Sequence, residues 1–320
     1  MPPSCDLSVI VPTYNYDAWI ESALRSVLAQ VPASAQVEIV VADDGSTDDT
    51  AQVVKALAAD LPIRYLHQTN SGPASARNLA MSQAGGRYLM FLDSDDSLQP
   101  GCIETTLAFL EQHPEVGLFF TNYDIYDEQG VVTASGVDTW SGFRGLAHRE
   151  VGDGEWVFSE SLTPHLIGGG SFMHTSGLTI RREVYEQIGP FREGYSYGED
   201  DEFYARAAWV TTAGYVDRVL SRKRNHKESL IHAPQNALRN DRQILELAEI
   251  QAEYYVADPH LRRILERKIR DCAVGYCWHL IVSGEISEAR KALRKYRALY
   301  PLHPAFYRLM LRSLFAPRRV

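Results

Sequence analysis

The sequence predicts an α/β fold in which a mostly parallel sheet carries helices on both faces and is followed by a C-terminal helical appendage. Short, continuously apolar segments alternate with stretches of helical periodicity over the first 120 residues, a pattern typical of parallel strands buried on both faces. From about residue 236 onward only the helical periodicity remains. The chain has 320 residues, 45% of them hydrophobic and 23% charged, which suits one α/β domain with an appendage.

The first 120 residues alternate between predicted strands and predicted helices. Ile20, Leu24 and Val27 recur at helical spacing, and Pro73 fits the first turn of a later helix. We expect strands at 7–11, 37–41, 63–66, 88–92 and 116–120, and helices at 17–29, 48–59, 73–83 and 101–112.

The rest of the chain is less regular at first and then entirely helical. Residues 127–175 are rich in Gly, Ser and Trp and predict loops with short elements. We expect strands at 177–180 and 215–220, and helices at 182–188, 199–210, 236–256, 259–282, 285–298 and 304–315. A domain boundary is therefore expected near residue 230.

The charge is unevenly distributed along the chain. Residues 261–320 carry 14 Lys and Arg against 4 Asp and Glu, whereas the first 260 carry 18 against 37. The basic helices could make a peripheral membrane contact, mediate oligomerisation or simply present solvated faces. Nucleic acid is not expected as a partner, because the basic residues are not interleaved with stacking aromatic residues.

Other features of the sequence predict a cytoplasmic protein, with the inner face of the membrane as a place for peripheral contact. The four cysteines form no CxxC pair, which favours a reduced chain. No apolar stretch approaches the 18 or so residues that span a bilayer, and the N-terminus lacks the pattern of a signal peptide.

Three polar clusters follow predicted strands, at the edge of a parallel sheet where ligands bind. They are "PTYN" at 12–15, "ADDGSTDD" at 42–49 and "DSDD" at 93–96. Each cluster alone is explained by a turn or a helix cap. Acidic turns at one edge together indicate a binding site.

The DSDD cluster predicts a metal site. In an extended segment Asp93 and Asp95 point the same way while Ser94 turns aside. Two carboxylates suit a hard cation, Mg²⁺ or Mn²⁺, that completes its shell with the phosphates of a nucleoside diphosphate. We expect the third carboxylate, Asp96, to be a loop or cap residue.

These motifs carry a resemblance to a known family. "LSVIVPTYN", "VEIVVADDGSTDDT", "SGPASARNLAMSQAGGRYLMFLDSDD", "SGLTIRREVYEQIGPF" and "GEDDEFYARAAW" resemble the family 2 inverting glycosyltransferases, over about residues 6–230. The resemblance implies a GT-A (Rossmann-like) domain at 1–230, with a nucleotide-binding half at 1–122 and an acceptor half at 123–230, before a helical region at 231–320. It also implies metal-dependent transfer of a sugar from a nucleotide-sugar donor, UDP- or dTDP-linked, to a glycan or lipid-linked glycan, in the synthesis of cell-surface polysaccharide or another glycoconjugate.

The resemblance further implies roles for individual residues. The general base is Asp200, with Glu199 as the alternative, while Asp201 and Glu202 form a charged first helical turn. His226 belongs to an Arg-x-His-x-x-Ser pattern with Arg224 and Ser229. The implied nucleotide ligands are Pro12, Thr13, Tyr14, Asn15, Asp43, Asp44, Arg77, Asp93 and Ser94; the metal ligands are Asp93, Asp95 and His226; and the acceptor residues are His174 and Ser176.

Two other functions are compatible with parts of this pattern. "LMFLDSDDSL" also resembles the signature of haloacid-dehalogenase phosphohydrolases, in which Asp93 would be the nucleophile. That signature ends the first strand of its domain, with Gly and usually Thr at the positions of Asp96 and Ser97, whereas here it ends the fourth strand. A non-catalytic sugar-nucleotide-binding protein is the other alternative, although carboxylates for both metal and base are present.

Overall fold

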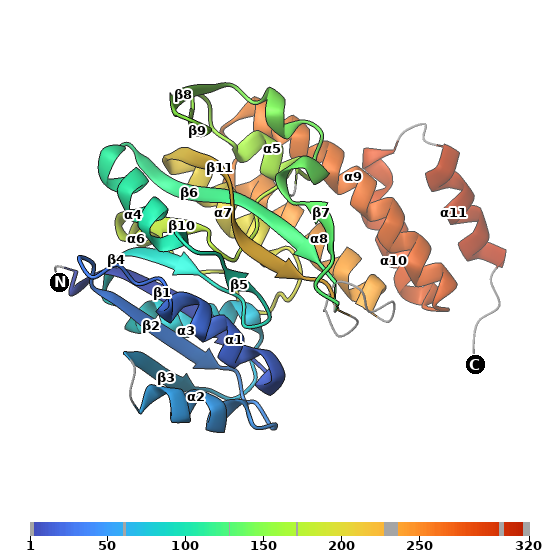
Figure 1. Cartoon of the computed structure of the whole chain (residues 1–320). Coiled ribbons are helices and arrows are strands. Elements are labelled where there is room, and N and C mark those ends of the chain that lie inside the picture. The colour runs from blue at the N-terminus through green and yellow to red at the C-terminus, as the bar shows by residue number, and fades with distance from the viewer. Residues whose placement is uncertain are drawn as a thin grey trace. The chain divides into compact units, whose positions relative to one another are not determined.

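The structure is a computed structural model, and it describes residues 3–59, 62–127, 129–170, 172–226, 236–300 and 304–315. The chain separates into two compact units (Figure 1). Unit 1 comprises Met1–Leu166, Gly170–Tyr195 and Glu199–His226, and unit 2 comprises Ile167–Gly169, Ser196–Gly198 and Lys227–Val320. The boundary expected near residue 230, and Ser229 of the predicted pattern, lie outside the described residues.

Unit 1 is built on one mixed sheet. Its strands are β1 (Cys5–Thr13), β2 (Val37–Asp43), β3 (Ile63–His67), β4 (Gly86–Phe91), β5 (Ser97–Leu98), β6 (Val116–Tyr126), β7 (Val132–Ser135), β8 (His148–Gly152), β9 (Glu155–Phe158), β10 (Thr179–Arg181) and β11 (Thr212–Arg224). The order across the sheet is β3-β2-β1-β4-β10-β6-β11-β9-β8, with β5 on β11 and β7 on β6.

The helices of unit 1 alternate with these strands as predicted. They are α1 (Asp17–Leu28), α2 (Thr50–Ala58), α3 (Pro73–Gln83), α4 (Cys102–Gln112), α5 (Thr163–Ile167), α6 (Arg182–Ile188) and α7 (Glu199–Val210), with short 3-10 turns η1 (Val137–Thr139) and η2 (Phe143–Gly145). The last residue of α5 is assigned to unit 2. The predicted fold class, an α/β sheet with additional C-terminal helices, is confirmed.

The sheet departs from a simple parallel order at its middle. Strands β3, β2, β1 and β4 are mutually parallel, and β6 is parallel to β11. Between these two groups, β10 is antiparallel to both β4 and β6. The fifth predicted strand therefore does not lie beside the fourth, because a strand from much later in the chain is inserted there.

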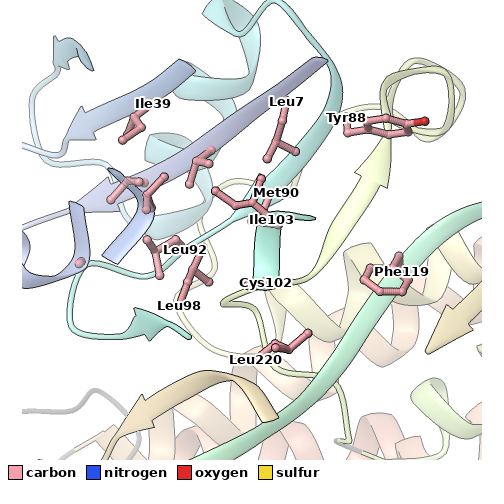
Figure 2. Close-up of a cluster of buried hydrophobic side chains, with 14 of the residues drawn as sticks. Leu7, Ile39, Tyr88, Met90, Leu92, Leu98, Cys102, Ile103, Phe119 and Leu220 are labelled. Carbon is pink, nitrogen blue, oxygen red and sulfur yellow. The ribbon is translucent and has the colours of Figure 1, made fainter. Parts of the chain in front are cut away.

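Alternation along the strands divides the core into two layers. Leu7, Met90 and Leu92 face α1, α2 and α4 in a cluster that also contains Ile103 (Figure 2). On the opposite face Phe91 contacts Phe203 of α7, and α3 packs on β1 and β2. A strand buried on both faces cannot alternate apolar with polar residues, which explains the continuous apolar runs in the sequence.

The region predicted as loops contains an additional hairpin. Strands β8 and β9 pair with each other, and β9 extends the sheet at β11. The aromatic residues Phe143 and Phe158 are buried against Phe120 and Tyr215 rather than presented to solvent. These aromatic residues therefore form the core of this half of unit 1.

Unit 2 is helical and has its own core. Its helices are α8 (Ala237–Tyr254), α9 (Pro259–Val282), α10 (Ile286–Tyr296), η4 (Arg297–Leu299) and α11 (Pro304–Phe315). Asp258 caps α9 by accepting hydrogen bonds from the backbone N–H groups of His260 and Leu261, and Pro259 fits the first turn. Within the parts of the chain that the structure describes, no helix combines the length and apolarity needed to cross a membrane.

Candidate active site

The loops that follow β1 and β2 are joined by hydrogen bonds at the carboxyl edge of the sheet. Asn15 has a φ of 55°, a left-handed conformation that Asn tolerates better than most residues. Its side-chain Oδ1 accepts from the Thr47 N–H at 2.7 Å, and its own N–H donates to the Ser46 Oγ at 2.9 Å. The sequence therefore placed PTYN and DDGS correctly at one edge, and the structure brings them into contact.

Thr13 and Tyr14 present different surfaces at this edge. Thr13 is buried, and its Oγ1 has no hydrogen-bond partner among the described residues. Tyr14 is 43% exposed, while Pro12 is buried in the strand. A buried hydroxyl without a partner costs free energy, so Thr13 is suited to receive a polar group of a ligand.

Asp43 and Asp44 both hold the loop after β2. The Asp43 carboxylate is completely buried and accepts from the Ser46 N–H at 2.8 Å and from the Tyr65 hydroxyl at 2.6 Å. The Asp44 carboxylate accepts from the N–H groups of Ser71 and Gly72 just before α3, and from the Gln68 side chain. Each Asp43 oxygen has a single hydrogen-bond partner among the described residues, and a carboxylate oxygen can accept more than one hydrogen bond.

The DSDD segment is a turn, which corrects the extended conformation expected from the sequence. The N–H of Asp96 donates to the carbonyl of Asp93 at 3.1 Å, and Ser94 is buried within the turn. The expectation that Asp93 and Asp95 point in the same direction assumed an extended backbone, and that assumption was wrong. Instead, each of the three carboxylates has its own basic partner.

Asp93 is paired with Arg77 of α3. The Arg77 Nη2 donates to Asp93 Oδ1 at 2.9 Å, and its Nη1 donates to Glu199 Oε1 at 3.0 Å. The side chains of Arg77 and Glu199 are each 6% exposed, whereas that of Asp93 is 28% exposed. Arg77 thus links the turn after β4 to the first residue of α7.

Asp95 is paired with His226 at the end of unit 1. The His226 Nε2 lies 3.0 Å from Asp95 Oδ2, and its ring packs against Trp19. Burial raises the pKa of Asp95, as do the neighbouring charges of Asp96 and Asp93, although the hydrogen bond from His226 opposes them. The Nδ1 of His226 is buried without a partner in the described part of the chain.

Asp96 anchors the turn, as expected for a loop residue. Its Oδ2 accepts from the Ser176 hydroxyl at 2.6 Å and lies 3.0 Å from His174 Nε2, and its Oδ1 accepts from the Arg224 N–H at 2.9 Å. Ser176 also accepts from the N–H of Asp93. Burial alone would raise the pKa of Asp96, but His174 and these hydrogen bonds lower it. The Ser176 hydroxyl is thus hydrogen-bonded to the turn, whereas His174 Nε2 lies close to Asp96 but makes no hydrogen bond with the described residues. The proposed contact of both residues with an acceptor stays a prediction.

Helix α7 begins with the carboxylates expected to include the base. Asp200 is half-buried, and its Oδ1 accepts from the N–H of Asp201. Glu199 is buried; burial, followed by the charge of Asp200, raises its pKa to about 7, against the lowering effect of Arg77. Glu202 is 2% exposed and bonded to Arg206, so it is a buried structural ion pair rather than part of a solvated first turn.

A divalent cation fits the chemistry of the turn, although the turn alone does not form a complete site. Asp93 and Asp95 supply the oxygen ligands that Mg²⁺ and Mn²⁺ prefer, each with one oxygen that has no side-chain partner among the described residues. No group of three or more His, Cys, Asp or Glu residues in the described ranges could hold a metal ion. A cation here would complete its shell with water and donor phosphates.

Some residues of the site escaped the sequence analysis. Tyr65 and Gln68 hold Asp43 and Asp44 from β3 and the loop that follows it, and only their position after a third strand could have suggested them. Arg224 was named in the sequence only as part of the Arg-x-His-x-x-Ser pattern. In the structure its N–H donates to Asp96, and its guanidinium lies over the Trp19 ring, 4.2 Å from the ring centroid.

Comparisons with known proteins show which family this chain is similar to. The family described as glycosyl transferase family 2 matches residues 8–189. An uncharacterized glycosyltransferase of Rickettsia felis is 33% identical over 218 residues, which are 68% of this chain and 33% of the relative. The poly(ribitol-phosphate) beta-N-acetylglucosaminyltransferase TarS of Staphylococcus aureus is 38% identical over 108 residues, 33% of this chain and 19% of TarS. The chain thus spans a third or less of the length of these two relatives.

Solved structures share the fold. Residues 1–349 of S. aureus TarS in complex with UDP-GlcNAc align with a TM-score of 0.67 at 19% identity, over 98% of this chain and 89% of that one. The mannosyltransferase PcManGT from Pyrobaculum calidifontis, in complex with GDP-Man and Mn²⁺, aligns with a TM-score of 0.59 at 19% identity, over 98% and 87%. At these identities the likeness concerns the fold alone.

Proposed function

This chain belongs to glycosyltransferase family 2, and from that premise we propose that it transfers a sugar from a nucleoside-diphosphate donor to a hydroxyl of a glycan or lipid-linked glycan. The observation that carries the proposal is the gathering of the turns after β1, β2 and β4 and the start of α7 at one edge of the sheet, where Arg77 joins the turn after β4 to α7. That edge is where ligands of open α/β sheets bind.

The donor is proposed to be UDP- or dTDP-linked and to lie over the ends of β1 and β2. Three features support a nucleoside there: the Thr13 hydroxyl, which has no partner among the described residues, the exposed ring of Tyr14 and the remaining acceptor capacity of Asp43. TarS is named as an N-acetylglucosaminyltransferase, and its structure contains UDP-GlcNAc, which favours a UDP donor for this chain as well. The same relative motivates our proposal that the acceptor belongs to a cell-surface polymer.

The chemistry that we propose is a single displacement. Asp200 takes the proton from the acceptor hydroxyl while that oxygen attacks the anomeric carbon, and the bond to the diphosphate breaks on the opposite face, which inverts the configuration. A Mg²⁺ or Mn²⁺ bound at Asp93 and Asp95 would supply positive charge for the leaving diphosphate. Asp200 suits the role of base because it is half-buried at the start of a helix and bonded only to an N–H of its own turn in the described structure.

Calorimetry with UDP, dTDP and GDP, each with and without Mn²⁺ or Mg²⁺, tests the donor site. We expect one of the three nucleotides to bind, and its affinity to fall when EDTA removes the metal. Slow release of UDP from UDP-sugars, followed without an acceptor, tests for catalytic competence. Absence of binding by all three nucleotides in the presence of metal would refute the proposal.

A further inference from the structure

Arg77 connects the two carboxylate groups of the site, and we propose that it is a positioning residue for the Glu199–Asp200 pair rather than a ligand of the nucleotide. The inference rests on the proposed function, because it assigns Asp200 the role of base. It replaces the role that the sequence resemblance implied for Arg77, and it is carried by the contacts of the arginine itself.

The guanidinium of Arg77 is enclosed; its Nε has no hydrogen-bond partner among the described residues, but both terminal nitrogens are bonded. Each of its terminal nitrogens donates to a carboxylate, one to Asp93 and the other to Glu199, at 2.9 and 3.0 Å. Its side chain is only 6% exposed, and its guanidinium carbon lies 5.5 Å from the centroid of the Phe191 ring. An arginine held in this way by two ion pairs and an aromatic ring is poorly placed to move toward a phosphate.

The ion pair with Glu199 separates the roles of two adjacent carboxylates. Glu199 is buried next to Asp200, and without a countercharge its burial and the charge of Asp200 disfavour its ionised form. Arg77 supplies that countercharge and, through its hydrogen bond, holds the Glu199 side chain against the guanidinium. Asp200 is then the carboxylate that remains available to accept a proton from a ligand.

The ion pair with Asp93 fixes the distance between donor and base. Asp93 follows β4, and Glu199 begins α7, 106 residues later in the chain. One rigid guanidinium bonded to both keeps the start of α7 in register with the turn that would hold the diphosphate. A displacement of about 1 Å at such a point can cost about 100-fold in rate, so the bridge is expected to act on turnover more than on donor affinity.

The decisive comparison is between Arg77→Met and the double variant Arg77→Met with Glu199→Gln. We expect Arg77→Met to lower kcat by about 10- to 100-fold while the Kd for UDP changes less than threefold. Replacing Glu199 by Gln in that background removes the uncompensated buried carboxylate, and we expect it to restore kcat at least several-fold. We also expect the kcat–pH profile to change in Arg77→Met, because Arg77 lowers the pKa of the neighbouring Glu199 and its loss removes that effect.

A matched control lies on α7 itself. Arg206 is buried and bonded to Glu202, but neither residue contacts Asp200 in the described structure. Arg206→Met should lower Tm without moving the pH profile. If Arg77→Met weakens UDP binding tenfold or more and Glu199→Gln does not rescue turnover, Arg77 is a nucleotide ligand and the inference is wrong. The inference is also wrong if Arg77→Met lowers activity only in proportion to its loss of Tm, because that result would mean that Arg77, like Arg206, has only a structural role.

A stability measurement keeps this test independent of the proposed function. If the wild type neither binds nucleotides nor turns them over, the proposed function fails. The Tm values of the wild type, Arg77→Met, Glu199→Gln and the double variant still measure the coupling between Arg77 and Glu199. We expect Arg77→Met to lower Tm and the added Glu199→Gln to recover part of the loss. Strictly additive Tm changes would overturn the inference by themselves.

Discussion

Replacing Glu199 by Gln should change how the stability of the protein depends on pH. Burial, followed by the charge of Asp200, raises the pKa of Glu199 to about 7 from an ordinary value of 4.5, against the opposing effect of Arg77. The folded protein therefore binds this proton more tightly than the unfolded chain. The stabilisation that the proton brings is complete below the unfolded pKa of 4.5 and is lost as the pH rises toward 7.

The size of the effect follows from the separation of the two pKa values. At 1.36 kcal/mol per pH unit, titration between pH 5 and pH 8 removes about 2–3 kcal/mol of stability from the wild type through this residue. Gln resembles the protonated acid in shape and does not titrate. The free energy of unfolding of Glu199→Gln minus that of the wild type should therefore increase by about 2–3 kcal/mol from pH 5 to pH 8.

Guanidinium unfolding at pH 5, 6, 7 and 8 measures this difference. Glu183→Gln, at an exposed position on α6, is the matched control and should show no such trend. A relative stability of Glu199→Gln that stays constant over the range, or that falls as the pH rises, would refute the reasoning about the buried carboxylate.

Three further predictions concern the base, the metal and the turn. Asp200→Asn should lower transfer about 10²- to 10⁴-fold in a product assay while UDP affinity stays the same, and a normal rate would remove Asp200 as the base. Because burial and the charges of Asp96 and Asp93 raise the pKa of Asp95, Mn²⁺-dependent UDP affinity should weaken from pH 8 to pH 5 by calorimetry; a constant affinity would argue against Asp95 as a ligand. Ser176→Ala removes one hydrogen bond from the Asp93 N–H and one from the buried Asp96 carboxylate and should destabilise the protein by about 1–3 kcal/mol in denaturant unfolding, so unchanged stability would contradict the role given to Ser176 in the turn.

The sequence identified the positions of the site more reliably than their interactions. The acidic pairs after β2 and β4 and at the start of α7 could be located, because each follows an apolar strand or opens an amphipathic helix. The partners of those carboxylates come from far along the chain: Arg77 and Glu199 are 122 residues apart, and Asp96 and Arg224 are 128 apart. Local spacing carries no information about contacts of that kind.

By itself the sequence determined the alternation of strands and helices, the family to which the chain belongs and the edge of the sheet where its acidic residues gather. Only the tertiary structure decided that 93–96 is a turn, that Asp43 and Glu199 are buried, and that Arg77 bridges two carboxylates. The physical reason is that hydrophobic periodicity and turn preferences depend on a few neighbouring residues. Burial and charge pairing depend instead on the order of the strands in the sheet. Here that depends on β10, which separates β4 from β6.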